Sequence, residues 1–344
     1  MIMNDEYPID IVITWVDGND PAWRHERDLY TGELQDTRER RYREWDNLQY
    51  WFRAIEKNAP WVNKIYFVTW GHLPQWLNTN NPKLIIVKHE DFIPHEFLPT
   101  FSNRTIEFNL HRIKGLSEHF VYFNDDMFLM TMTRKDDFFV NGLPCDTAIL
   151  RPIIVYDSSE KKERPHELFI APLVDMLVIN RYFKKNEVIR KNWRKWINLK
   201  YGRNVFRTLS MLPWPYFTGM VSLHTCYSLL KSSFVELWER EEDAFREICE
   251  RKFRTNTDYN SWIFSFWQLA KGTFWPRRTN FGKMFRLSSD MKITDETISA
   301  MKSGKYKTIC INDAVDDYDD FEKIKMRINA CFEELFPQKS SYEK

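Results

Sequence analysis

Short apolar segments that end in polar turns constrain the fold of this chain most. Ile9 to Val16 reads IDIVITWV and is closed by Asp17-Gly18-Asn19-Asp20-Pro21, and Phe120 to Phe123 runs straight into Asn124-Asp125-Asp126. The other two segments of this kind are Ile65 to Thr69 and Leu84 to Lys88. Runs rich in β-branched residues and bounded by turn residues predict strands.

Helical patterns separate these strands. Leu48, Trp51, Phe52 and Ile55 recur at helical spacing after a strongly charged surface segment, residues 24 to 46. Residues 104 to 118 suit a helix, and Leu73 to Leu77 suits a short helical turn. This order predicts an α/β fold whose mainly parallel sheet is flanked by helices.

The second half of the chain is mostly helical in pattern. Helices are expected over Ser228 to Arg246, Asn260 to Lys271 and Phe321 to Phe336, the last with Asp319 or Asp320 near its start. We therefore divide the chain into an α/β half (1–150), a basic and aromatic helical insertion (151–220) and a helical half that completes the site (221–344).

Composition excludes several classes of protein. The 344 residues carry 50 Lys and Arg against 49 Asp and Glu, a net charge of +1 that gives no general attraction to nucleic acid. The five cysteines are widely spaced without a C-x-x-C pair, as in reduced cytosolic proteins. Neither a signal peptide nor a membrane span is expected, and the dinucleotide fingerprint, Walker loop, H-E-x-x-H and G-x-S-x-G are missing from the sequence.

Acidic residues follow two of the predicted strands. Loops at the carboxyl ends of parallel strands meet in one crevice, so Asp17 and the pair Asp125-Asp126 are expected to converge. Carboxylates there suit a divalent cation that binds a diphosphate. The alternative is that each acidic cluster caps a helix or closes a turn.

Other ionisable residues are weaker candidates. Glu107 and His111 would share a helix face with Arg104 one turn earlier, either as a sugar or phosphate site or as a solvated face. His224 could act as a general base. Arg254, with Asp258 close behind, could neutralise a phosphoryl group.

Residues 181 to 207 form a basic and aromatic stretch. It contains ten Lys and Arg residues and one acid, Glu187, interleaved with aromatic side chains. It would hold an anionic polymeric acceptor, touch a lipid surface, or be an ordinary exposed helix pair.

Four blocks of the sequence resemble the Stealth family, which comprises bacterial capsular polysaccharide hexose-1-phosphate transferases and the catalytic part of animal N-acetylglucosamine-1-phosphotransferase. These blocks are IDIVITWVDGNDPAW, REWDNLQYWFRAIEKNAPWVNKIYFVTWGHLPQWLN, LPTFSNRTIEFNLHRIKGLSEHFVYFNDDMFL and CINDAVDDYDDFEKIKMRINACFEELFP. The resemblance covers most of residues 9 to 130 and 220 to 340.

The resemblance implies a Rossmann-like (GT-A-like) sheet and a site built from several parts of the chain. It places Asp17 at the end of the first strand, where animal members have Asn. The second block supplies Glu107, His111, Asn124, Asp125 and Asp126. We match His224 to the opening histidine of the third block, and Arg254 with Asp258 to its R-x-x-x-D element, although Thr255 stands where animal members carry a histidine.

The implied reaction moves a hexose-1-phosphate or HexNAc-1-phosphate from a UDP-sugar to a glycan hydroxyl, leaves a phosphodiester and releases UMP. Asp125 and Asp126 would hold Mg²⁺ or Mn²⁺ with the help of Asp17. Arg254 and Arg104 would stabilise phosphoryl oxygens, and His224 or Asp258 would accept the proton.

Two rival functions stay open from the sequence. One is a metal-dependent glycosyltransferase that releases UDP, and the other is a glycan- or membrane-binding protein without catalysis. The expected acceptor is a glycan or a lipid-linked oligosaccharide, and the expected location is the cytoplasm or the inner face of the plasma membrane, with residues 181 to 207 as the membrane contact.

Overall fold

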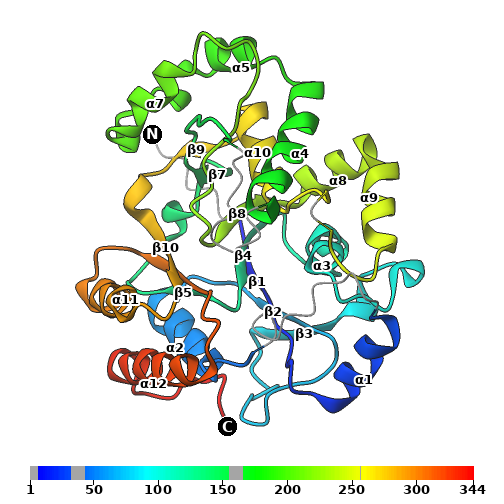
Figure 1. Ribbon diagram of the computed structural model, residues 1–344, viewed down its shortest axis with the longest axis vertical. Helices are drawn as coiled ribbons and strands as arrows, with labels where there is room; N and C mark the ends of the chain where they lie inside the picture. The colour runs from blue at the N-terminus through cyan, green and yellow to red at the C-terminus, as the bar shows by residue number, and fades with distance from the viewer. Residues whose placement is uncertain (1–6, 32–42, 155–165, 256) are drawn as a thin grey trace.

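The computed structural model describes residues 7–31, 43–154, 166–255 and 257–344. Its central sheet has the strand order β3-β2-β1-β4-β8. The strands are β1 (Ile9–Thr14), β2 (Ile65–Thr69), β3 (Leu84–Lys88), β4 (His119–Asn124) and β8 (Tyr227–Leu230). The first four are parallel and β8 joins the edge antiparallel to β4, which confirms the predicted α/β fold with a mainly parallel sheet (Figure 1).

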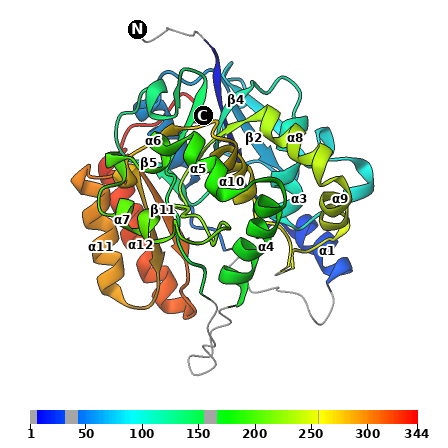
Figure 2. The same ribbon diagram turned by 90° about the horizontal axis from the view of Figure 1, so that it is seen from above.

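The central sheet is buried on both faces because apolar side chains alternate along its strands. Ile11 and Ile13 enter one hydrophobic cluster, whereas Val12 enters the other. The first cluster includes side chains of α2 (Leu48–Asn58) and α12 (Tyr318–Leu335), and the second includes side chains of α8 (Lys231–Arg240) and α10 (Trp262–Lys271). Figure 2 shows α12 with α11 (Met291–Ser303) on one side of the molecule and α8 and α9 (Glu242–Glu250) on the other.

A second sheet starts where β4 ends. Asp125 and Asp126 form the turn between β4 and β5 (Met127–Leu129). Strand β5 pairs antiparallel with β11 (Thr308–Asp313), which pairs parallel with β10 (Gly282–Leu287). The two adjacent aspartates therefore stand at the junction between two sheets.

The remaining elements surround this framework. The short strands are β6 (Phe139–Val140), β7 (Leu143–Asp146) and β9 (Trp275–Pro276). The other helices are α1 (Pro21–Tyr30), α3 (Asn103–Phe108), α4 (His166–Tyr182), α5 (Lys185–Lys191), α6 (Trp193–Trp196) and α7 (Asn204–Ser210). Six 3₁₀ turns cover His89–Asp91, His95–Phe97, Leu110–Arg112, Lys135–Asp137, Leu199–Tyr201 and Thr279–Phe281 within the described residues.

Two predicted helical segments are wrong in extent or type, whereas the short turn expected over Leu73 to Leu77 is present. The helix expected over 104–118 ends at Phe108, because the side-chain amide of Asn109 turns back to the Thr105 carbonyl (2.8 Å) and a 3₁₀ turn follows. The segment 73–77 is a single turn in which Leu77 N–H donates to Pro74 C=O (3.0 Å).

The segment predicted as a helix over Ser228 to Arg246 contains three elements. Its first residues form strand β8, because β4 offers them a free sheet edge, and Glu241 separates α8 from α9. The last two predicted helices are confirmed as α10 and α12, the latter capped by Asp317, whose side chain accepts from Asp320 N–H.

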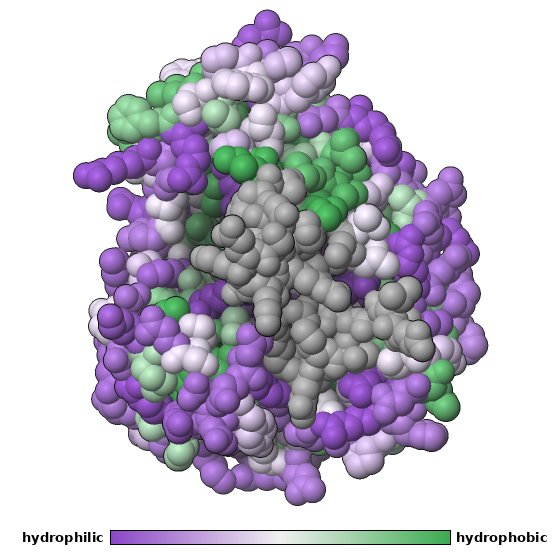
Figure 3. All heavy atoms as spheres, in the orientation of Figure 1, coloured by the Kyte–Doolittle hydropathy of each residue, from purple (hydrophilic) through white to green (hydrophobic). Residues whose placement is uncertain are grey.

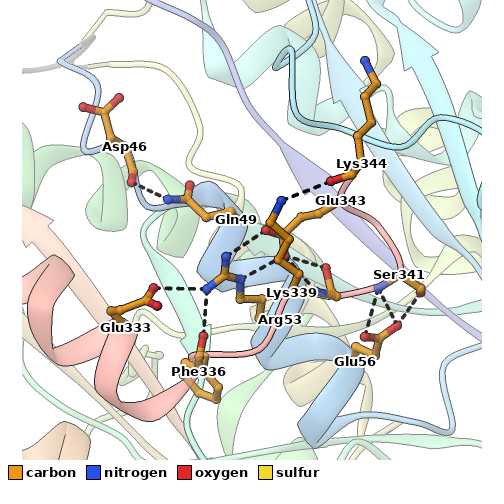
Figure 4. A network of polar contacts seen from close by, with 11 residues as sticks. Asp46, Gln49, Arg53, Glu56, Glu333, Phe336, Lys339, Ser341, Glu343 and Lys344 are labelled. Atoms are coloured by element: carbon orange, nitrogen blue, oxygen red, sulfur yellow. Dashed lines mark hydrogen bonds and ion pairs between the residues drawn. The ribbon is translucent and has the colours of Figure 1, made fainter.

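The C-terminal segment folds back onto α2. Arg53 forms ion pairs with Glu343 (2.9 Å) and Glu333 (3.2 Å) and donates to the Phe336 carbonyl (2.9 Å), as Figure 4 shows. The nearby Glu56 carboxylate accepts from Ser341 N–H. The last residues are thus tied to the helix that covers one face of the central sheet.

Candidate active site

The carboxyl ends of β1 and β4 lie side by side. Thr14 and Asn124 are register partners in the parallel pair, so the residues that follow each strand leave the sheet at the same edge. Asp17 follows β1, and Asp125 and Asp126 follow β4. The structure therefore places these three predicted site residues at one edge of the sheet.

A fourth carboxyl group, that of Glu44, interacts electrostatically with Asp17 and Asp125. Glu44, which sequence reasoning missed, accepts a hydrogen bond from Trp15 Nε1 (3.3 Å). Burial raises its pKa to about 7, and the charges of Asp46 and Asp17 add to the shift. Solvent reaches Asp125, but protein surrounds it on most sides, and this burial with the charges of Asp126 and Glu44 raises its pKa to about 8.

Among the residues that the structure describes, these acids have no Lys or Arg partner, since neither type forms an ion pair with Asp17, Glu44, Asp125 or Asp126. Asp126 Oδ1 is buried and has no hydrogen-bond partner there. Crowded carboxylates with an unpartnered oxygen fit a hard divalent cation, which takes oxygen ligands.

Asp126 also faces a histidine and a cysteine. Cys310 Sγ, from β11, donates to Asp126 Oδ2 (3.2 Å), and ligand atoms of Asp126, His224 and Cys310 all lie within 4.8 Å of one another. Burial raises the pKa of Asp126, whereas His224, Cys310 and Asn312 oppose the shift. The structure thus brings His224 to the acidic cluster from a segment about a hundred residues further along the chain.

His224 has an unusual backbone conformation, and several neighbours hold its ring in place. Its φ is +48°, in the left-handed region that a residue with a Cβ rarely adopts. Its N–H donates to Ser222 Oγ (3.2 Å), its Nδ1 lies 3.4 Å from the Tyr227 hydroxyl, and its ring meets Trp262 edge to face. Such strain at a residue held by several neighbours is typical of functional sites.

A buried polar network lies beside the acids. The Tyr122 hydroxyl is 2.6 Å from Asn124 Oδ1, 3.0 Å from Glu107 Oε1 and 3.0 Å from Thr14 Oγ1. Burial and the charge of Glu107 raise the pKa of Tyr122 well above its usual value. Asn124 and Glu107 are therefore joined through one phenol, so the structure connects two predicted substrate-binding residues.

The two predicted arginines lie at the edge of this network. Arg104 pairs with Glu107 (3.6 Å), and its charge also acts on the buried carboxyl of Asp175 in α4. Arg254 Nη1 donates to Asn103 Oδ1 (3.4 Å), and the amide of Asn103 donates to Glu107 (3.2 Å). Both guanidinium groups are thus linked to Glu107.

Two predicted site residues, Asp258 and His111, make their contacts with residues outside the acidic cluster. Asp258 is buried, pairs with Arg251 (2.6 Å) and accepts from Thr255 N–H (2.6 Å), so its carboxylate closes the loop that carries Arg254. His111 packs on Phe234 and Trp238, and burial lowers its pKa to about 3.

A direct role for these two residues stays a prediction, and their contacts support structural roles. Because α3 ends before His111, the shared helix face expected for Glu107 and His111 does not form.

The residues that sequence reasoning missed had only partial signals. Glu44 lies in the charge-dense run 24–46, where nothing distinguishes it from its neighbours. Asn312 and Asp313 end β11, much as Asn124 ends β4 and Asp125 follows it. This repeated strand-end pattern could have pointed to Cys310 and its neighbours.

Family models match three regions of the chain. They are Stealth protein conserved region 1 over residues 7–35, conserved region 2 over 41–145 and conserved region 4 over 301–344. The acids and Cys310 lie inside these regions, whereas His224, Arg254 and Asp258 lie outside them.

Three curated relatives match over nearly their whole length. "Capsular polysaccharide phosphotransferase WcwK" of Streptococcus pneumoniae is 43% identical over 348 residues, covering 99% of this chain and 100% of the relative. "Exopolysaccharide phosphotransferase cps2G" of Lactiplantibacillus plantarum is 34% identical, covering 100% and 98%. "Receptor polysaccharide phosphotransferase WefC" of Streptococcus gordonii is 37% identical, covering 97% and 98%.

The fold, the acid-lined strand ends and these relatives define the class of the protein as a sugar-phosphate transferase enzyme. The chain belongs to the Stealth family.

Proposed function

We propose that this enzyme transfers a hexose-1-phosphate or HexNAc-1-phosphate from a UDP-sugar to a hydroxyl of a glycan acceptor during capsule or cell-surface polysaccharide synthesis. The observation that carries the proposal is the group of four carboxyl groups that have no Lys or Arg partner within the described ranges, faced by His224. The names of the relatives support phosphotransfer in polysaccharide synthesis, and the donor and the released nucleotide are our proposal.

In the proposed reaction, the acceptor oxygen attacks the β-phosphorus of the donor. A new P–O bond forms to the acceptor, the bond between the β-phosphorus and the bridging oxygen breaks, and UMP leaves with the electron pair. The hydroxyl proton passes to a base on the enzyme. Such transfers require alignment and charge neutralisation more than covalent help from protein.

His224 is our choice for the base. Its ring is fixed by Tyr227 and Trp262 next to Asp126, whereas both carboxylate oxygens of Asp258 already accept hydrogen bonds. The carboxylate of Asp126 would stabilise the imidazolium that forms when the proton arrives.

Asp125 and Asp126 would hold Mg²⁺ or Mn²⁺, with Glu44 and Asp17 close enough to contribute negative charge. The bound ion would neutralise charge on the diphosphate. Arg254 and Arg104 approach from the Glu107 network and would hold phosphoryl oxygens of the donor.

The test is incubation of the purified protein with a panel of UDP-sugars, acceptor glycan and Mg²⁺, followed by identification of the nucleotide and by ³¹P spectroscopy. UMP with a phosphodiester signal supports the proposal, whereas UDP supports the rival glycosyltransferase. Asp126→Ala should lower the rate about a thousandfold or more. Asp28→Ala, at an exposed residue of α1, is the control; wild-type UMP release by Asp126→Ala would contradict the metal assignment.

A second pair of measurements separates the two roles open to His224. If His224 is the base, His224→Gln should abolish transfer while leaving Mn²⁺ affinity, measured by calorimetry, close to that of the parent. Equal loss of Mn²⁺ binding in His224→Gln and Asp126→Ala would instead make His224 a metal ligand.

A further inference from the structure

Residues 193–216 expose an unusual number of large hydrophobic side chains. Six of the sixteen exposed large hydrophobic residues in the described parts of the chain lie in this short segment. They are Trp193, Leu199, Phe206, Leu209, Trp214 and Tyr216. Leu199 is 94% exposed and Phe206 72%. We call this segment, together with Arg190 and Lys191, the basic-apolar surface.

The basic-apolar surface lies in a part of the sequence whose charged residues are all basic. Between Glu187 and Glu236 the sequence has no acidic residue and eight Lys or Arg, although the whole chain is nearly neutral. Six of these cations are exposed and, among the described residues, have no acidic partner: Arg190, Lys191, Arg194, Lys200, Arg203 and Arg207.

Arg151 and Arg207 lie close enough for their charges to interact. Burial lowers the pKa of Arg151, and the charge of Arg207 adds to that shift. Like charges left adjacent on a surface favour binding of an anion.

The inner side of the same segment is firmly packed. Trp196 and Tyr201 are fully buried, and Lys185 Nζ donates to the carbonyls of Met211 (2.7 Å) and Leu212 (2.9 Å). Lys195 Nζ likewise donates to the carbonyl of Gly272 at the end of α10, and Lys200 Nζ donates to that of Pro276 in β9. The exposed side chains therefore project from a fixed base.

The surface occupies one end of the molecule. Figure 1 shows α5 and α7 at the end opposite to the C-terminus, and in Figure 3 hydrophobic and hydrophilic side chains stand side by side over α7. The chain continues from this surface to the site, since residues 211–223 lead directly to His224.

We propose that the basic-apolar surface docks the enzyme on an anionic lipid bilayer. Protruding Trp, Phe and Leu side chains beside Lys and Arg are the composition of interfacial membrane contacts. A glycan would be bound by carboxylates and amides around an aromatic face, whereas this stretch has no carboxylate and presents the aliphatic Leu199. The proposal deepens the proposed function, since docking would bring the site to lipid-linked acceptor, but lipid binding itself does not depend on that function.

Co-sedimentation with vesicles tests the proposal on the full chain. Vesicles of phosphatidylcholine with phosphatidylglycerol should bind the protein at 0.1 M salt, and binding should fall at about 0.5 M salt or with phosphatidylcholine alone. Each Lys or Arg near such a surface is worth roughly fivefold in affinity. Arg203→Gln with Arg207→Gln should therefore weaken binding about tenfold or more, as should Leu199→Ser with Phe206→Ser.

The matched control is Leu29→Ser with Met326→Ser, two residues of similar exposure, 70% and 69%, outside the basic-apolar surface. This control should bind vesicles like the parent. Equal binding by the surface variants and the control, or no binding to anionic vesicles, would overturn the proposal. Binding to a soluble anionic polysaccharide in place of vesicles would also overturn it, in favour of a glycan site.

UMP release toward a soluble acceptor, measured without vesicles, separates this proposal from the proposed function. The surface variants should retain that activity, because their residues lie outside the candidate active site. Loss of vesicle binding with unchanged UMP release supports lipid docking, and vesicle binding by a protein that releases no UMP would leave docking intact while rejecting the proposed function.

Discussion

Glu44 is the residue whose role is most open to a direct test. Its carboxyl interacts electrostatically with Asp17 and with Asp125, and its pKa is raised to about 7, chiefly by burial. We expect Glu44→Gln to lower the rate of transfer about a hundredfold, because the site loses one of its four ionisable carboxyl groups. Initial rates at saturating Mg²⁺ would measure this.

Stability distinguishes a functional role of Glu44 from a structural one. A carboxylate crowded by other carboxylates is not a stabilising group, so Glu44→Gln should leave the thermal midpoint unchanged or raise it. Glu90→Gln, at an exposed glutamate, is the control. A lower midpoint together with unchanged activity would show that Glu44 supports the fold alone.

Two buried histidines give the protein a predictable response to acid. Burial lowers the pKa of both His89 and His111 to about 3. The unfolded chain takes up these protons near pH 6.5 but the folded chain does not, so their contribution makes stability fall as pH drops from about 6.5 toward 3. The slope is about 1.4 kcal/mol per pH unit for each histidine.

Urea unfolding at pH 7, 6 and 5 would measure this slope. His111→Gln should make the loss of stability between pH 6 and pH 5 smaller by about that amount, whereas His25→Gln, at an exposed histidine, should not change it. Parallel pH profiles for His111→Gln and the parent would contradict the prediction.

At the residue scale, the sequence predicted which side chains would meet only where the order of the strands brought their ends together. Asp17, Asp125 and Asp126 could be predicted to converge, because parallel strands that end at one edge bring their loops together. Glu44 could not, and the strand-end pattern of β11 was only a partial signal for Cys310, since their positions depend on how the segment before α2 and strand β11 pack against that edge.

At the element scale, apolar runs and helical periodicity predicted strands and helices better than charge patterns did. Strands β2 and β3 match their predicted ranges, because short, mostly apolar and β-branched runs between turns have few alternatives. The segment that became β8 was read as helix, since the sequence of Ser228 to Leu230 contains no sign that β4 has a free edge to pair with. Local propensity cannot show such tertiary pairing.

The ion pair between Arg53 of α2 and Glu343 of the C-terminal segment, which we call the clamp, is the contact between elements that mutation can test most directly. The side chains of Arg53 and Glu343 are 10% and 5% exposed (Figure 4). Arg53→Ala should lower the free energy of unfolding by about 3 kcal/mol, because it leaves the Glu343 carboxylate buried without its partner. Chemical denaturation would measure the loss.

The control for this clamp is an exposed ion pair. Arg327 and Asp295 are 42% and 61% exposed, so Arg327→Ala should leave the denaturation midpoint almost unchanged. Adding Glu343→Gln to Arg53→Ala should recover part of the loss, since the unpaired charge is then removed. A loss that is equal for Arg53→Ala and Arg327→Ala would refute the clamp.

At the scale of the whole molecule, the α/β half depends on strands that come later in the chain. Strand β4 takes its edge partner β8, and β5 takes its partner β11, from beyond residue 150. The hydrophobic clusters that bury the central sheet also include side chains of α8, α10 and α12. The division at residue 150, read from the change in sequence pattern, therefore separates segments that share both sheets and core.

This dependence predicts how fragments should behave. A fragment of residues 1–150 should show no cooperative thermal transition, because it lacks the edge strands and a large part of the apolar surface that covers its sheet. Co-expression with residues 151–344 should restore a folded, active complex, because the two pieces together contain every strand of the three sheets, including the small sheet β6-β7-β9. Near-ultraviolet circular dichroism and UMP release would measure both outcomes, and cooperative unfolding of 1–150 alone would establish the α/β half as an independent domain.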